Sequence, residues 1–159
     1  MRNKMIRNKQ KGFSLIELLI VVAIILIIAA IAIPNLLRSK MAANEASAVG
    51  SLRTINTASV EYSTTYGGYP PSLVSLSPAT PATSTSADLI DSVLSAGTKS
   101  GYTFTYTPTT VGGIVQSYTL TAGPVTIGTT GQRGFFTSQS GVIRADASGT
   151  ATVTSTPIS

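Results

Sequence analysis

The side chains that could carry out catalysis or hold a metal are scarce in this chain. Its 159 residues include no His, no Cys and only 6 Asp plus Glu. A disulfide framework, a thiolate zinc site and a thiol nucleophile are therefore excluded, and the commonest general base is missing. Beyond residue 66 the acids are Asp88, Asp91 and Asp146. The spacing of Asp88 and Asp91 is more typical of a solvated helix face than of a catalytic pair.

Other recognisable sites are also missing from the sequence. Calcium requires six to eight oxygen ligands, usually from several carboxylates, and no such cluster occurs. There is no phosphate-binding loop, no nucleophile elbow and no basic-aromatic pattern for nucleic acid, since Arg133 and Arg144 are isolated. The sequence therefore predicts a protein that is not an enzyme, with no cofactor, no metal and no nucleic-acid partner.

The formal charge of +5 is concentrated at the N-terminus. Five of the 11 basic residues fall within the first twelve positions, which contain no acid: Arg2, Lys4, Arg7, Lys9 and Lys11. From Phe13 onward, six basic residues balance six acidic ones. The basic character thus belongs to a short tail and does not indicate a nucleic-acid-binding surface.

A long apolar segment follows this tail. Residues 13–33 contain only Ser14 and Glu17 as polar side chains, and Pro34 ends the run. The length is sufficient for a membrane-spanning helix, and the preceding positive charges place the N-terminus in the cytoplasm and the remainder outside. An ionised carboxylate in such a segment costs roughly 2.5–3.5 kcal/mol on insertion scales, so Glu17 calls for a cationic partner.

Two ordinary interpretations explain this region only in part. A secretory signal peptide would use Ala30-Ile31-Ala32 as its cleavage site, but its apolar core is usually about 7–15 residues long and carries no acid. A plain single-pass anchor leaves Glu17 and the Gly12-Phe13 junction unexplained.

The residues 11–18, Lys-Gly-Phe-Ser-Leu-Ile-Glu-Leu, together with the apolar run and Ile33-Pro34-Asn35, resemble the N-terminal segment of type IV prepilins and type II secretion pseudopilins. The resemblance covers residues 9–40. It implies that a prepilin peptidase cuts between Gly12 and Phe13 and that Phe13 becomes the N-methylated first residue. Glycine suits such a cut because its backbone enters a protease cleft without a side chain.

The resemblance also implies a role for Glu17 in assembly. The amino group that cleavage creates on Phe13 lies four residues before Glu17, and in an assembly the amine of one subunit can pair with Glu17 of its neighbour. The alternative is a glutamate that only extends toward the lipid headgroups. The implied partners are identical subunits in a helical filament, the prepilin peptidase, the inner-membrane pilus assembly machinery and, before assembly, membrane lipid.

The resemblance implies an α+β, type IV pilin-like fold, in which a long N-terminal helix packs against a small antiparallel sheet. Residues 1–12 form the removed leader, 13–34 the transmembrane and assembly helix, and 35–66 its amphipathic second half. We expect a kink at Pro34. Mostly apolar and aromatic residues at three- and four-residue spacing form one stripe along the second half: Leu37, Met41, Val49, Leu52, Ile55, Ser59, Tyr62 and Tyr66.

The rest of the chain changes character after Gly67. Residues 67–100 read as a Pro/Ser/Thr-rich loop with a short helix over 88–95, and Ser72–Ser86 either carries O-glycans or stays unmodified. Residues 101–159 read as an antiparallel sheet region. Its expected strands cover residues 102–107, 115–121, 134–138, 142–146 and 150–154.

The sequence therefore favours a type IV pilus subunit that starts as an inner-membrane precursor and ends in an extracellular filament. A type II secretion pseudopilin is the near alternative, although the major pseudopilin typically carries a calcium-binding loop that has no counterpart here. Many type IV pilins carry a C-terminal disulfide, which this chain lacks. A membrane-anchored, non-polymerising surface adhesin is the third possibility, but it does not need the Gly12-Phe13 junction.

Overall fold

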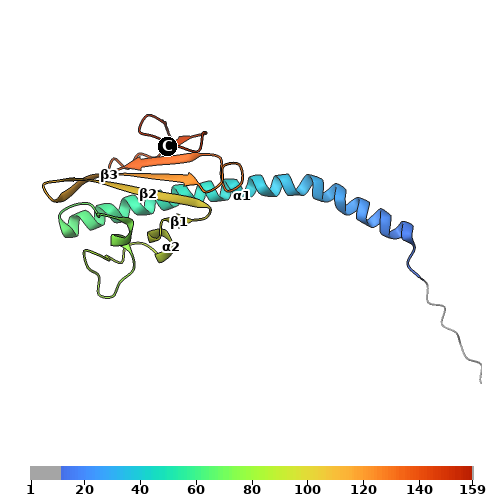
Figure 1. Cartoon of the computed structure of the whole chain (residues 1–159), viewed down its shortest axis with the longest axis horizontal. Helices are drawn as coiled ribbons and strands as arrows, with labels where there is room; N and C mark the ends of the chain where they lie inside the picture. Colours follow the sequence, from blue (N-terminus) through green and yellow to red (C-terminus); the bar gives the residue numbers. More distant parts are fainter. Residues whose placement is uncertain (1–11, 159) are drawn as a thin grey trace, which may run out of the picture. The chain divides into compact units, whose positions relative to one another are not determined.

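The computed structural model describes residues 12–158, so the basic residues of the predicted leader lie outside the described part. One long helix precedes two short helices and six strands (Figure 1). The helices are α1 (Leu15–Tyr66), the 3-10 helix η1 (Leu73–Leu76) and α2 (Ser92–Ser95). The strands are β1 (Thr98–Lys99), β2 (Tyr102–Val111), β3 (Ile114–Pro124), β4 (Gly134–Ser138), β5 (Arg144–Asp146) and β6 (Thr156–Pro157).

The six strands form one antiparallel sheet in the order β1-β2-β3-β4-β5-β6. Each strand pairs with the next one along the chain, as in a meander. The longest pair, β2 and β3, is joined by Gly112 and Gly113, whose φ angles are 61° and 81°. A two-residue turn with positive φ at both central positions favours glycine and matches the twist of the flanking strands.

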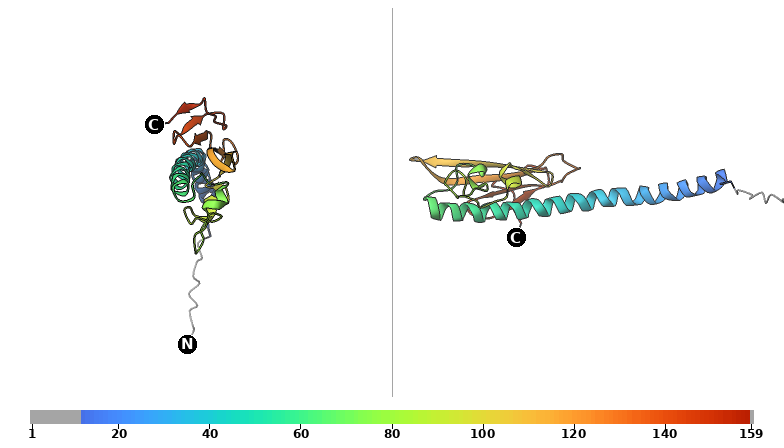
Figure 2. Two further views of the ribbon diagram at one scale, coloured as in Figure 1. Left: turned by 90° about the vertical axis from the view of Figure 1, so that its left-hand side faces the viewer. Right: turned by 90° about the horizontal axis from the view of Figure 1, so that it is seen from below.

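The chain divides into two compact units, Met1–Leu36 and Leu37–Ser159, and α1 contributes residues to both. In the second unit, the part of α1 from residue 37 onward runs along one face of the sheet (Figure 2). Of the predicted stripe, Leu52, Ile55, Ser59 and Tyr62 are buried there, and Met41 and Val49 are half-buried. Leu37 and Tyr66, at its two ends, are exposed. The sheet contributes Phe104, Tyr118, Leu120 and Phe135 to the same core. This arrangement confirms the predicted α+β class.

In the first unit, every Leu, Ile, Val and Phe from residue 13 to residue 33 is exposed. Pro34 lies within α1, whose helical assignment continues through it. Proline removes one backbone donor from the helix, and the kink that we expect there stays a prediction.

The predicted strand over 150–154 is wrong, because these residues form a loop and the last strand is β6. Hydroxyl groups hold the loop locally: Thr152 N–H donates to Ser155 Oγ at 3.0 Å, and the Thr152 and Thr154 hydroxyls lie 3.0 Å apart. Ser and Thr side chains that bond to nearby backbone compete with strand pairing. The alternating pattern of this segment was therefore misleading.

The region between α1 and the sheet also differs from the prediction. Leu73 and Leu76 of η1 are buried in the core, so this part of the predicted surface loop is structural. The short helix expected over 88–95 is confined to α2. Asp91 caps α2, because its side chain accepts a hydrogen bond from Leu94 N–H at 2.9 Å.

Candidate processing and assembly site

The Gly12-Phe13 junction lies just before the first turn of α1. Neither residue belongs to a helix or strand, and both are exposed, with Phe13 at 79%. A Cβ atom added at Gly12 would meet no other atom within 4 Å. The fold therefore does not itself require glycine at this position, and the peptide bond after it is open to another molecule.

Ser14 and Glu17 close the N-terminus of α1. The backbone N–H of Ser14 donates to Glu17 Oε2 at 2.9 Å, and Ile16 N–H donates to Ser14 Oγ over a longer 3.4 Å. This reciprocal pattern is a capping box, in which two side chains satisfy donors that the first turn leaves open. The helix dipole adds to the stabilisation, since it favours a negative charge at this end.

The capping box was not anticipated from the sequence, although a signal for it was present. Ser14-Leu15-Ile16-Glu17 before an apolar run fits the Ser/Thr-x-x-Glu pattern of a helix start. The predicted need of Glu17 for a partner is met in part by this neutral donor. Within residues 12–158, the second oxygen of Glu17 accepts no hydrogen bond, and the side chain is exposed. The carboxylate therefore remains accessible to a cation.

The apolar stretch after Glu17 has the dimensions of a membrane span. By length and composition, the described helix α1 can cross a bilayer, and none of its most apolar window is buried within the chain. Pro34 ends the unbroken apolar run after Glu17, and the next charged residue is Arg38.

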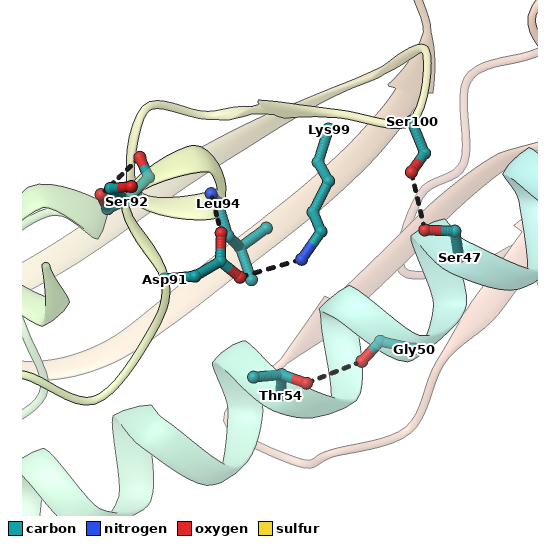
Figure 3. Close-up of polar contacts among 9 residues, drawn as sticks. Ser47, Gly50, Thr54, Asp91, Ser92, Leu94, Lys99 and Ser100 are labelled. Atoms are coloured by element: carbon teal, nitrogen blue, oxygen red, sulfur yellow. Dashed lines mark hydrogen bonds and ion pairs between the residues drawn. The ribbon is translucent and has the colours of Figure 1, made fainter. Parts of the chain in front are cut away.

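The acids of the sheet unit serve separate local structures. Asp91 pairs with Lys99 Nζ at 2.8 Å (Figure 3). Nearby, the Ser47 hydroxyl of α1 donates to the Ser100 hydroxyl of the β1-β2 turn at 2.9 Å. Asp146 accepts from Ser148 N–H at 2.9 Å. Among residues 12–158, no group of three or more His, Cys, Asp and Glu side chains is placed to hold a metal ion.

One acidic contact ties α1 to the loop before β4. Glu45 Oε1 accepts hydrogen bonds from the N–H groups of Gln132 and Arg133, both at 3.0 Å, and Arg133 Nε donates to Oε2 at 2.8 Å. The Glu45 side chain is only 12% exposed. Its burial opposes ionisation, but these donors and the guanidinium outweigh that effect, so the pKa of Glu45 is lower than usual. This carboxylate is a structural clamp.

Comparison with known proteins finds similarity in the N-terminal segment of the chain. Residues 7–33 match the family described as the prokaryotic N-terminal methylation motif. Over 35 residues the chain is 66% identical to the type IV wide pilus major component PilA4 of Thermus thermophilus. That match covers 22% of this chain and 27% of the relative, so the chain spans about a quarter of the relative's length. No solved structure matches the chain. The N-terminal segment of this protein therefore carries the prokaryotic N-terminal methylation motif and is similar to part of a type IV pilin.

Proposed function

We propose that this protein is a structural subunit of a type IV pilus filament. It is made as a prepilin in the bacterial inner membrane, with its N-terminus in the cytoplasm. The prepilin peptidase cuts between Gly12 and Phe13, and Phe13 is N-methylated. The inner-membrane assembly machinery then adds the subunit to a helical filament of identical chains, which extends outside the cell.

The observation that carries this proposal is the exposed apolar span behind an accessible glycine junction. From Phe13 to Ile33 every large apolar side chain lacks cover within the described chain. Burying one Leu, Ile or Val side chain contributes about 1.5–3 kcal/mol relative to water. A span of this kind requires lipid first, and packing against the same span of other subunits provides an equally apolar environment afterwards.

The capping box supports a role for Glu17 in that packing. Its carboxylate is bound on one oxygen by Ser14 N–H, one residue after the position where cleavage creates a cationic amine. The amine of Phe13, from the same or a neighbouring subunit, supplies the charge that the second oxygen lacks. A carboxylate paired in this way sets the register between helices, because an unpaired charge in an apolar environment is costly.

Mass spectrometry of filaments sheared from the cell surface tests the proposal. The expected result is abundant chain that begins with N-methyl-Phe13. Full-length protein that stays in the membrane, with no filaments, contradicts the proposal and favours the non-polymerising adhesin. Processed and methylated chain found only in the cell envelope favours a type II secretion pseudopilin.

A further inference from the structure

The face of the sheet that points away from α1 carries a regular set of threonines. On β2 these side chains alternate with buried ones, since Tyr102 and Phe104 face the core. On β3 the same alternation occurs around the buried Tyr118 and Leu120. We call these six residues the hydroxyl face: Thr103, Thr105, Thr107, Thr109, Thr119 and Thr121.

The strand register aligns these threonines in two rows. Thr105 lies opposite Thr121, and Thr107 lies opposite Thr119. Side chains on one face of a strand repeat about every 6.6–6.8 Å, and neighbouring strands lie about 4.7–4.9 Å apart. The result is a grid of hydroxyl groups at regular intervals along the longest hairpin of the protein.

These hydroxyl groups are available to another molecule. Within residues 12–158, none of the six side chains forms a hydrogen bond, and all are exposed except the half-buried Thr121. Hydroxyl clusters elsewhere bond among themselves, such as Thr83 with Thr85 and Thr152 with Thr154, each at 3.0 Å. The hydroxyl face therefore differs from these self-bonded clusters.

One end of the hydroxyl face is also hollowed. A trough of about 250 Å³ lies there between Thr103, Thr105 and Thr121 on the strands and the loop residues 149–151. A chain-like ligand that lies along the hydroxyl face would be partly enclosed at this point.

The chemistry of the hydroxyl face narrows the class of ligand. It has no charged side chain, so it offers no attraction to nucleic acid or to anionic lipid. It has no Trp, Tyr or Arg, the residues that usually dominate the binding energy of protein interfaces. What it offers is a series of neutral donors and acceptors, because each hydroxyl both donates and accepts. A neutral polyol has the matching groups.

We propose that the hydroxyl face binds a neutral polysaccharide, with the chain lying along the β2-β3 hairpin and entering the trough. Each contact is weak, because net hydrogen-bond energies in water are about 0.5–1.5 kcal/mol. Strong attachment therefore rests on the proposed function, since a filament presents many copies of the same face and multiplies the apparent affinity.

The test measures retention of the full chain on three insoluble neutral glucans: microcrystalline cellulose, amylose resin and cross-linked dextran. The double variant Thr105→Val/Thr121→Val removes two hydroxyls at the trough while keeping β-branched side chains of similar shape. The control is Thr126→Val/Thr129→Val, because both residues are exposed and lie outside the hydroxyl face. Protein is tested as sheared filaments and as detergent-solubilised full chain coupled densely to beads, which separates binding from filament formation.

We expect wild type and control to be retained on at least one glucan, with retention unchanged by added salt because no charge is involved. The retention of the hydroxyl-face variant should be at least tenfold lower than that of wild type, both as filaments and on beads. Retention of wild type on none of the three glucans overturns the proposal, as does equal retention of the hydroxyl-face variant. If that variant folds but no longer forms filaments, while its bead retention is unchanged, the hydroxyl face is a contact between subunits and the proposal fails.

Discussion

The carboxylate of Glu17 accepts a hydrogen bond from the backbone N–H of Ser14 at 2.9 Å, so the acid within the apolar span is bound by the start of its own helix. This bond holds the Glu17 carboxylate at the backbone of Ser14, the residue that directly follows the Gly12-Phe13 junction. The proposed processing step and the proposed pairing step therefore concern the same few atoms. Substitutions at Gly12 and at Glu17 separate the two.

Replacing Gly12 with valine should block cleavage and leave the fold unchanged. No atom lies within 4 Å of a Cβ at this position, so the side chain causes no clash within the chain. A branched side chain would instead obstruct a protease cleft that accepts extended backbone. Intact mass and thermal unfolding of the membrane-extracted protein check both parts. The control is Gly50→Ala in α1, also in open space, which should be cleaved normally. Normal removal of the leader from Gly12→Val contradicts the assignment.

Glu17→Gln separates the cap from the charge. Glutamine keeps an oxygen that accepts from Ser14 N–H, as in other capping boxes, but it cannot pair with an amine. We expect Glu17→Gln and Glu17→Ala to be cleaved normally and to lower the yield of sheared filaments at least tenfold alike. Glu61→Gln, at an exposed site near the other end of α1, is the control. If Glu17→Gln assembles like wild type, the cap and not the charge is what assembly needs.

The Glu45 clamp predicts a loss of stability in acid. Because the folded state lowers the pKa of Glu45, its contribution is fully present above the unfolded pKa of about 4.3 and disappears as the pH falls through the lower folded value. Glu45→Gln should be less stable at neutral pH by about 1.5–3 kcal/mol, the usual range for hydrogen bonds to a charged group. Denaturant unfolding from neutral pH to below pH 4 measures the difference. A wild type and variant whose curves stay parallel throughout that range contradict the clamp.

Buried tyrosines predict a loss of stability in alkali. Burial raises the pKa of Tyr102 and of Tyr118 to about 12, and burial together with the neighbouring Tyr118 raises the pKa of Tyr106. Their contribution is complete below the unfolded pKa of about 10 and is lost as the pH rises through the folded values. Ultraviolet absorbance of tyrosinate should therefore rise together with the loss of near-ultraviolet circular dichroism.

Tyr106→Phe gives the matched comparison for this alkaline transition. In the described chain the buried Tyr106 hydroxyl has no hydrogen-bond partner, whereas Tyr118 donates to Asn56 Oδ1 at 2.9 Å. Removing an unpartnered buried hydroxyl costs nothing in lost bonds. Tyr106→Phe should match or exceed wild type at neutral pH and unfold at higher pH, while Tyr118→Phe should be less stable. The reverse order would contradict the assigned burial of the two hydroxyls.

The elements that could be predicted from the sequence are those with a strong local pattern. The long helix ends at Tyr66 as expected, because two glycines follow it, and β4 has the predicted limits at Gly134 and Ser138. The loop at Thr152 could not be predicted, because the choice between ladder pairing and local hydroxyl bonds depends on whether a neighbouring strand is available.

The candidate site was predicted more unevenly. The apolar span and its exposure follow from composition, since side chains with no polar alternation cannot form the surface of a small soluble unit. The second role of Glu17 as a helix cap was missed because its place in an apolar segment pointed toward a charged partner or the lipid headgroups. Ser14 carried the missing information, and its significance depends on where the helix begins.

The continuity of α1 has a mechanical consequence. Helix α1 contains both the exposed apolar span and the core residues Leu52 and Ile55, and its helical assignment continues through Pro34. In the proposed filament, tension applied through the span would reach the sheet unit through α1, which lacks one backbone hydrogen bond at Pro34. The packing of Leu52 and Ile55 against the sheet would then oppose sliding of α1 along the sheet. The strength of the fibre would depend on the same side chains that fold the subunit.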